Sequence, residues 1–390
     1  MSDDGGLDGL DAAVDRLLRE FPPGSTAPQR FLEAQFDLGL AWVHHPVGAG
    51  GRGASCALQA HVDGRLAAVD APRTPGAQVI GKGMAAPVLM QYGTAVQQQR
   101  YLRPIFSGEE IWCQLFSEPG AGSDIAGLAA NAVRDGDTWV VNGQKVWTSL
   151  GHVARFGLLV ARTDATVPKH RGLTFFVCDM HAPGVEVRPL RQLTGDAEFN
   201  EVFLSDVEIA DDQRLGDVGN GWAVVLATLM NERATLGTAS QATVALDALL
   251  DAWTHADIRP PAYRDRIARL WSEVECLRLM SARRSGGAGG PGAEASLLKL
   301  GTAELGQRIL DTLVTVLGAA GMLVDSYEMH RPEQLGLVGP PTRMFLRSVA
   351  STIEGGTSNV QRNIIAERVL GLPGDVRVDR DVPWLDVLRG

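Results

Sequence analysis

The sequence is poor in cysteine, has no basic excess and contains no long apolar run. Its net charge of −10 argues against non-specific binding to nucleic acid or to an anionic membrane. No stretch reaches the ~18 apolar residues that span a bilayer, and the N-terminus has no basic segment followed by an apolar one. Neither a metal cluster nor a disulfide framework is expected from four widely spaced cysteines, Cys56, Cys113, Cys178 and Cys276. We therefore expect a cytoplasmic protein that binds no metal, nucleic acid or membrane.

The chain is long, and its hydrophobic pattern changes twice along the sequence. Its 390 residues suffice for two or three domains. Apolar residues recur at helical spacing before about residue 112, β-prone segments follow up to about residue 215, and long helical patterns then return. The order predicts an α+β protein with an N-terminal helical domain (1–112), a middle antiparallel β domain (113–215) and a C-terminal four-helix bundle (216–390).

Within these regions the patterns predict particular elements. An Asn142-Gly143 pair between two β-prone arms predicts a hairpin across residues 138–147. Helical periodicity near residues 220–255, 262–284, 294–320 and 342–371, with short connections, predicts the four helices of the bundle. Four further strands are expected at residues 157–162, 173–178, 185–190 and 198–204.

The motif richest in chemistry is F-S-E-P-G-A-G-S-D at positions 116–124. Its proline and glycines favour a tight turn with exposed backbone N–H groups, and glycine lets the backbone approach a ligand closely. Successive N–H groups beside a serine hydroxyl suit a phosphate or a flavin carbonyl. Taken alone, Gly-Ala-Gly is also typical of a plain surface loop, and no βαβ pattern surrounds it to make a dinucleotide fingerprint.

Three motifs together resemble those of the acyl-CoA dehydrogenase family. S-E-P-G-A-G-S-D (117–124) is followed by N-G-Q-K-V-W-T (142–148), and E-G-G-T-S-N-V-Q-R (354–362) lies near the end of the chain. Weaker matches occur in family order at 50–53, 217–222 and 317–321. The resemblance implies the same order of domains as the periodicity does. It also implies FAD, with its flavin ring between the β domain and the bundle.

The resemblance assigns roles to matching residues. Taken without the motifs, Trp147 could equally be a buried core aromatic, and Ser117 and Thr148 could be structural hydroxyls. The resemblance implies flavin contacts for Leu115, Ser117, Trp147 and Thr148, phosphate or ribose contacts for Gly122, Ser123, Thr357 and Asn359, and substrate contacts for Ser123, Arg233 and Gly355.

The reaction that the resemblance implies needs a base for the α-proton of a thioester, and two glutamates compete for this role. Many family members place the base immediately before Gly-Thr, but here Gly355 occupies that position, one residue after Glu354. Glu232 lies three residues after Leu229 and seven after Val225, on an apolar helical face. A carboxylate there is costly unless it is paired or functional.

Part of the family carries its base at this helix position, beside an arginine, and Asn231-Glu232-Arg233 resembles that pattern. We therefore predict Glu232 as the base, with Glu354 as the alternative. A structural ion pair is the other interpretation of Glu232.

The motif that binds the adenine half of FAD in common family members, A-R-x-R-x-x-F-G, is absent from positions 251–259, and Thr315 replaces a usual glutamine. Arg264 or Arg266 is a possible substitute. The departure resembles a bacterial subgroup in which some members form heteromeric pairs.

These observations predict FAD-dependent α,β-dehydrogenation of an acyl-CoA or acyl-carrier thioester. An electron-transfer flavoprotein is the expected electron acceptor, and a homodimer or homotetramer, or a heteromeric pair, the expected assembly. The alternatives are a flavin-dependent monooxygenase or N-hydroxylase of the same fold, or a structural subunit of a heteromeric dehydrogenase. The acyl group is left open.

Overall fold

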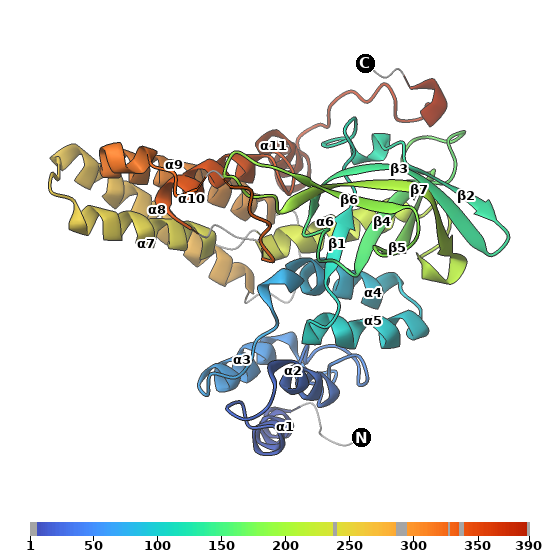
Figure 1. The fold of residues 1–390 in the computed structure, drawn as a ribbon, viewed down its shortest axis with the longest axis horizontal. Helices are drawn as coiled ribbons and strands as arrows, with labels where there is room; N and C mark the ends of the chain where they lie inside the picture. The colour runs from blue at the N-terminus through green and yellow to red at the C-terminus, as the bar shows by residue number, and fades with distance from the viewer. Residues whose placement is uncertain (1–5, 237–239, 286–294, 327, 335–338, 388–390) are drawn as a thin grey trace.

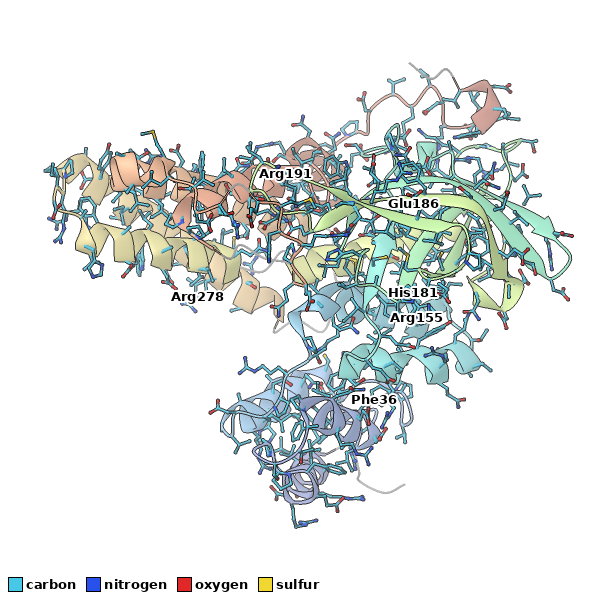
Figure 2. The ribbon with its side chains drawn as sticks, viewed as in Figure 1. Phe36, Arg155, His181, Glu186, Arg191 and Arg278 are labelled. Carbon is cyan, nitrogen blue, oxygen red and sulfur yellow. The ribbon has the colours of Figure 1, made fainter. Side chains whose placement is uncertain are left out.

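A computed structural model describes residues 6–236, 240–285, 295–326, 328–334 and 339–387. Figure 1 shows three parts: helices near the N-terminus, a β-sheet above them, and a long helical arm that extends sideways from the sheet. In Figure 2, Phe36 lies among the N-terminal helices and Arg278 lies on the arm, away from the sheet. This arrangement confirms the predicted α+β architecture.

The N-terminal part is helical, as expected. A capping box between Thr94 and Gln97 starts α5, and Gly108 ends it in a left-handed conformation with φ of 80°. The helices are α1 (Leu7–Glu20), α2 (Pro28–Asp37), α3 (Gln59–Ala67), the π-helical turn η3 (Gly81–Ala85), α4 (Ala86–Tyr92) and α5 (Ala95–Ser107).

The middle part is one sheet whose strands pair in the order β6-β7-β3-β2-β4-β5-β8, with β1 added beside β4. Most pairs are antiparallel, as predicted, but β1 and β2 each run parallel to β4. The strands are β1 (Trp112–Leu115), β2 (Asn131–Asp135), β3 (Thr138–Ser149), β4 (Phe156–Arg162), β5 (Leu173–Asp179), β6 (Val185–Leu190), β7 (Phe199–Ala210) and β8 (Arg214–Leu215).

The predicted hairpin at Asn142-Gly143 is wrong. Residues 138–149 form one continuous strand, β3, whose register with β7 shifts between Val141 and Gly143. A Cβ at Gly143 would lie 2.4 Å from the Cβ of Ala130, so the glycine allows a close approach within the sheet rather than a turn. The turn instead lies before β3, at Gly136 with φ of 60°, between β2 and β3.

The two faces of the sheet are both covered. On one face Trp112 packs edge-on against Tyr101 of α5, and this core continues to Val224 and Val225 of the first C-terminal helix. The other face carries a separate core around Leu115, Trp139 and the strands β4, β5 and β7. The sheet is therefore a rigid platform on which the loops at its ends are held in place.

The C-terminal part differs in detail from the expected four long helices. The segment expected as one helix at 220–255 contains two, α6 and α7, and residues 237–239 between them lie outside the described residues. Within the described ranges, no helix is both long and apolar enough to cross a bilayer. The helices are α6 (Gly221–Leu236), α7 (Ser240–His255), α8 (Pro261–Ser285), α9 (Ala295–Leu317), α10 (Pro341–Ser348) and α11 (Ser358–Ile364).

Helix α6 lies at the junction of the three parts, while α7, α8 and α9 form the arm (Figure 1). It packs against α4 and η3 below the sheet, against β5, and against α9. This burial on several sides explains why its sequence is apolar almost all round. The junction brings the end of α6 next to the loops that carry the C-terminal motif.

Candidate active site

The loop that carries S-E-P-G-A-G-S-D is held by Glu118. Its nearly buried carboxylate accepts hydrogen bonds from the backbone N–H groups of Ala129 (2.6 Å) and Ala130 (2.9 Å). Glu118 also exchanges two backbone hydrogen bonds with Ala121, at 3.1 and 3.0 Å. The glutamate of the motif is therefore a structural residue that shapes the turn, and Gly122 and Ser123 remain exposed on it.

Lys145 links this loop to the second motif. Its fully buried ammonium lies 2.8 Å from the carboxylate of Glu118 and donates to the Phe116 carbonyl at 3.2 Å. Burial lowers the pKa of the Lys145 ammonium, and the charge of Glu118 opposes that shift. The two motifs thus fold as one unit through a buried ion pair, a role that the sequence did not reveal.

Trp147 adopts a strained backbone conformation next to this unit. Its φ is 60°, at the register shift between Lys145 and Thr148, which is an outlier for a bulky residue. The indole is 60% exposed and lies edge-on to the ring of Phe199, with centroids 6.1 Å apart. Trp147 is therefore not the buried core aromatic of the alternative interpretation.

The neighbouring hydroxyls differ in accessibility. Thr148 is fully buried, and its Oγ1 has no hydrogen-bond partner among the described residues. Ser149, which follows Thr148 in β3, is half-buried. Ser149 was not among the residues predicted from the sequence, because none of the matched motifs includes it. Ser149 is a second candidate beside Thr148 for a hydroxyl at the flavin edge.

The other predicted flavin contacts lie close by. Ser117 is half-buried, and its carbonyl accepts a hydrogen bond from Val146 N–H at 2.9 Å, so it is adjacent to Trp147. Leu115 is fully buried in the core of the sheet, which leaves its side chain unavailable to a ligand. An exposed indole, a buried hydroxyl without a partner among the described residues and an exposed Gly-Ser turn fit a bound FAD.

The third motif forms a turn of two left-handed glycines, Gly355 (φ 62°) and Gly356 (φ 91°). Buried Gln361 donates from Nε2 to the carbonyls of Gly355 (2.9 Å) and Gly356 (3.3 Å). The positive φ at position 356 favours glycine, and a Cβ there would also lie 2.5 Å from that same nitrogen. Thr357 begins α11 by accepting a hydrogen bond from Val360 N–H at 3.2 Å. The motif therefore fixes a rigid turn, which we name the base turn (354–357).

Both candidate bases line one small cavity at this turn. The cavity has a volume of about 40 Å³ and receives the side chain of Glu232, which is 8% exposed, from the end of α6. Its lining residues are Glu232, Gln241, Lys299, Thr302, Ala303, Ser351, Glu354 and Gly355. The structure thus brings together three of the residues that the sequence selected: Glu232, Glu354 and Gly355.

Position 355 and the carboxyl of Glu232 converge on one point. A Cβ built on Gly355 would lie 3.6 Å from Oε1 of Glu232 and 3.6 Å from Cε of Lys299. A side chain immediately before Gly356-Thr357 would therefore enter the space that Glu232 reaches from α6. The two positions expected to carry a base in this family address the same region of the cavity.

Glu354 has a different environment. Arg347 of α10 binds its carboxylate with two hydrogen bonds, at 2.9 and 3.1 Å, and also lies 2.8 Å from the buried carboxylate of Glu198. Burial raises the pKa of Glu198, and the Arg347 charge opposes that rise. Glu354 is thus one member of an ion-pair network that ties the base turn to the start of β7.

This network also connects the two halves of the site, which are the β-domain motifs around Trp147 and the base turn with Glu232. The guanidinium of Arg347 lies 5.4 Å from the ring centroid of Phe199, the residue that contacts Trp147. Trp147, Phe199, Arg347 and Glu354 therefore form a continuous row from β3 to the base turn. The row therefore links the exposed Trp147, through two intervening side chains, to Glu354, which lines the cavity of Glu232.

Lys299 of α9 was missed by the sequence analysis. It is 8% exposed and donates from Nζ to the carbonyls of Ser351 (2.9 Å) and Gly356 (2.7 Å). Its position in the sequence could have revealed it, because Lys299 lies in the buried stripe of α9, four residues after Ala295 and three before Thr302. A charged residue within such a stripe is rare and points to a specific partner.

Other predicted residues lie apart or outside the description. Asn359 is exposed on α11, and the side chain of Arg233 lies outside the described residues. Arg266 of α8 pairs with Asp311 of α9 at 2.8 Å, and Arg264 lines an open apolar hollow of about 390 Å³ between α7 and α8. Among the described side chains, no group of histidine, cysteine and acidic residues is arranged to hold a metal ion.

Comparison with known families accounts for most of the chain. Residues 12–109, 113–207 and 219–370 match the N-terminal, middle and C-terminal domain models of acyl-CoA dehydrogenase, respectively. These ranges cover every site residue discussed above.

Individual relatives of this chain are also acyl-CoA dehydrogenases. The chain is 38% identical to acyl-CoA dehydrogenase IpdE1 of Mycobacterium tuberculosis, covering 87% of this chain and 86% of the relative. It is 40% identical to acyl-CoA dehydrogenase FadE34 of the same organism, over 86% of this chain, and spans 45% of that relative's length.

A similar solved structure is the ChsE4-ChsE5 complex from Mycobacterium tuberculosis, with a TM-score of 0.71 and 28% identity over 96% of this chain and 100% of that one. A "Tcur3481-Tcur3483 steroid ACAD" gives a TM-score of 0.72 at 25% identity, over 94% of this chain and 97% of that chain. The chain therefore belongs to the acyl-CoA dehydrogenase family of flavin-dependent oxidoreductases.

Proposed function

We propose that this chain removes hydrogen from the Cα–Cβ bond of an acyl thioester, with Glu232 as the base that takes the α-proton. The observation that carries the proposal is the convergence at the base turn. The Cβ that glycine lacks at position 355 would lie 3.6 Å from Oε1 of Glu232. The carboxylate from α6 thus reaches the space that a side chain immediately before Gly-Thr would enter, which supports Glu232 as the base.

The environment of Glu232 suits a base better than that of Glu354. A carboxylate that is 8% exposed is held away from bulk water, which favours proton uptake at the moment of reaction. Glu354 is held by two hydrogen bonds from Arg347, and these engage both of its carboxylate oxygens and restrict its movement. Glu354 therefore serves to fix the base turn rather than to remove the proton.

Residues of both halves would hold the cofactor, which supplies the hydride acceptor when bound. Trp147 and Ser117, with Thr148 or Ser149, would contact the flavin ring. Gly122 and Ser123 would bind phosphate with exposed backbone N–H groups and a hydroxyl. Thr357 and Asn359 at the start of α11 would contact the ribose–pyrophosphate portion.

The thioester would lie between the exposed face of Trp147 and the base turn. The backbone N–H groups of Gly355 and Gly356 are the candidates for holding its carbonyl oxygen, where negative charge develops. Ser123 and Arg233 are the other proposed substrate contacts. Coenzyme A is the proposed carrier of the acyl group, and an electron-transfer flavoprotein is the proposed electron acceptor.

The acyl group is proposed by likeness to relatives. One structural neighbour is described as a steroid acyl-CoA dehydrogenase, at 25% identity. A steroid side-chain thioester therefore belongs in the first substrate panel, beside straight-chain, branched and aromatic acyl-CoA compounds. Anaerobic bleaching of the flavin would rank these substrates directly.

A heteromeric pair is the second candidate assembly. The usual adenine-binding motif is absent from 251–259, and Arg266 is engaged by Asp311 within the chain. Structural neighbours include the ChsE4-ChsE5 complex, which contains two different chains. A folded but colourless protein after purification alone, which gains flavin on addition of a partner chain, would support this assembly over a homo-oligomer.

The test of the base compares two matched variants. Glu232→Gln should slow substrate-dependent flavin reduction by about 10²–10⁴-fold while leaving the bound FAD spectrum intact. Glu354→Gln should retain most of the reduction rate. Stopped-flow absorbance under anaerobic conditions measures both rates. Normal reduction by Glu232→Gln together with loss in Glu354→Gln would reverse the assignment.

A further inference from the structure

The last part of the chain lies beyond the family match, which ends at residue 370. After α11 the backbone leaves the bundle and returns to the β domain (Figure 1), where Trp384 and Leu385 contact the segment between β4 and β5. The middle of this segment is open to solvent, with Val376 85% and Val378 86% exposed. We name residues 371–387 the C-terminal strap. Its far end docks next to the loop that carries Gly122 and Ser123.

Trp384 is the main contact of the strap. It is 8% exposed, and its indole N–H donates to the carbonyl of Gly127 at 3.3 Å. Its backbone N–H donates to the Val167 carbonyl at 2.9 Å, and Leu385 N–H donates to the Ala165 carbonyl at 3.2 Å. A solvent-exposed strap thus ends in a buried aromatic anchor that is hydrogen-bonded on two sides.

Arg162 lies beneath this anchor and organises the same loop. Its guanidinium carbon lies 4.2 Å from the centroid of the Trp384 ring, within the range of a cation–π contact. The guanidinium is nearly buried and donates to the carbonyls of Ala126 (2.6 Å) and Leu128 (3.1 Å). Trp384 therefore covers the cation that holds the chain just after Ser123 and Asp124.

A second contact reaches the motif itself. Lys169 lies 2.7 Å from the carboxylate of Asp124, the last residue of S-E-P-G-A-G-S-D, and 2.6 Å from that of Asp379 in the strap. The ammonium is mostly buried while both carboxylates are partly exposed. Lys169 thus joins the strap to the residue that follows Ser123.

We propose that the C-terminal strap positions the loop 122–128 for binding of the FAD phosphates, with Trp384 as its positioning residue. The inference rests on the proposed cofactor contacts of Gly122 and Ser123. Because the strap follows α11 and the π-helical turn Ile365–Val369, one continuous segment of chain connects the base turn to the cofactor loop. Docking of Trp384 fixes this loop before the cofactor arrives and lowers the entropy lost on binding.

The test uses the full chain with Trp384→Ala and, as the matched control, Leu385→Ala, whose side chain is 60% exposed. FAD affinity is measured by the change in flavin fluorescence on titration of the apoprotein. We expect Trp384→Ala to weaken FAD binding about tenfold and Leu385→Ala to leave it unchanged. Asp379→Asn, which removes only the ion pair, should weaken binding about twofold to threefold.

Hydrogen exchange of the apoprotein gives a readout that does not need the cofactor. Trp384→Ala should speed exchange at residues 122–130 and leave the strands β3 and β7 protected. Unchanged FAD affinity and unchanged loop exchange in Trp384→Ala would overturn the proposal. If the wild-type chain binds no FAD but Trp384→Ala still loosens the loop, the assignment of the cofactor site fails while the strap's hold on the loop is supported.

Discussion

The two halves of the site are each organised by a buried lysine, and the two lysines act differently. Lys145 in the β domain is fully buried and pairs with Glu118 at 2.8 Å. Lys299 in the bundle is 8% exposed, donates to two backbone carbonyls and lines a cavity that also contains Glu232 and Glu354. The first lysine fixes a loop, while the second adds positive charge beside acids.

This difference shows that, in one fold, some buried charges hold the structure together while others affect the reactivity of the site. A buried ion pair within the sheet holds two sequence motifs together, so that its loss affects the whole loop. A cation beside the candidate base changes the energy of the ionised carboxylate, so that its loss affects the pH at which the base works. Variants at Lys145 should therefore lose stability, whereas variants at Lys299 should change the pH dependence of the reaction.

The largest effect is expected from Lys145→Met. This change leaves the carboxylate of Glu118 buried without its cation, which costs about 3–5 kcal/mol of stability. Denaturant unfolding followed by circular dichroism measures the loss, and the cofactor should dissociate during purification. The matched control is Arg188→Met on β6, whose partner Glu186 is exposed on the same sheet (Figure 2). An equal loss in both variants would contradict a special role for the buried pair.

A smaller loss is expected from Arg347→Met, which breaks the link between Glu198 and the base turn. Burial already raises the pKa of Glu198, and removal of Arg347 removes the charge that opposes this rise. The unfolded state then releases the proton at a lower pH than the folded state does. Stability should therefore fall by about 2–3 kcal/mol at neutral pH and by less near about pH 5, where Glu198 can stay protonated.

Unfolding curves at the two pH values check this prediction, because a deficit that is independent of pH would exclude Glu198 as its source. Ser348→Ala, next to Arg347 and uncharged, is the control and should show no such pH dependence.

The smallest effect is expected from Lys299→Met, and it should appear in the pH profile of flavin reduction. Glu232 must be ionised to act, so the rate falls as the pH drops through its pKa. Among the described lining residues, the charged side chains beside Glu232 are Lys299 of α9 and Glu354, which Arg347 holds. Loss of the nearby cation raises the pKa of the base, and the acid limb should move to higher pH by about one unit.

Lys299→Arg keeps the positive charge and should leave the acid limb near its wild-type position. A profile that shifts equally in both variants would mean that Lys299 acts through the shape of the base turn rather than through its charge.

The sequence by itself determined the class and order of the architecture, because hydrophobic periodicity reports local structure. An acid on the apolar face of a helix stands out, and together with the resemblance of Asn231-Glu232-Arg233 to a family pattern it selected Glu232. The resemblance of the motif 354–362 to the C-terminal family signature singled out the segment that forms the base turn. The sequence misplaced the turn at Asn142-Gly143, where glycine serves a close approach to Ala130 within a continuous strand. Local patterns cannot distinguish a turn from such a bulge.

Only the tertiary structure decided which distant residues meet. The pairing of Glu118 with Lys145, the approach of Lys299 to the base turn and the docking of Trp384 beside Gly127 join segments separated by many residues. No local spacing encodes these contacts, because they depend on how α6, α9 and the sheet pack around a shared core. The chemical nature of each side chain follows from the sequence, whereas the packing decides which side chains come into contact.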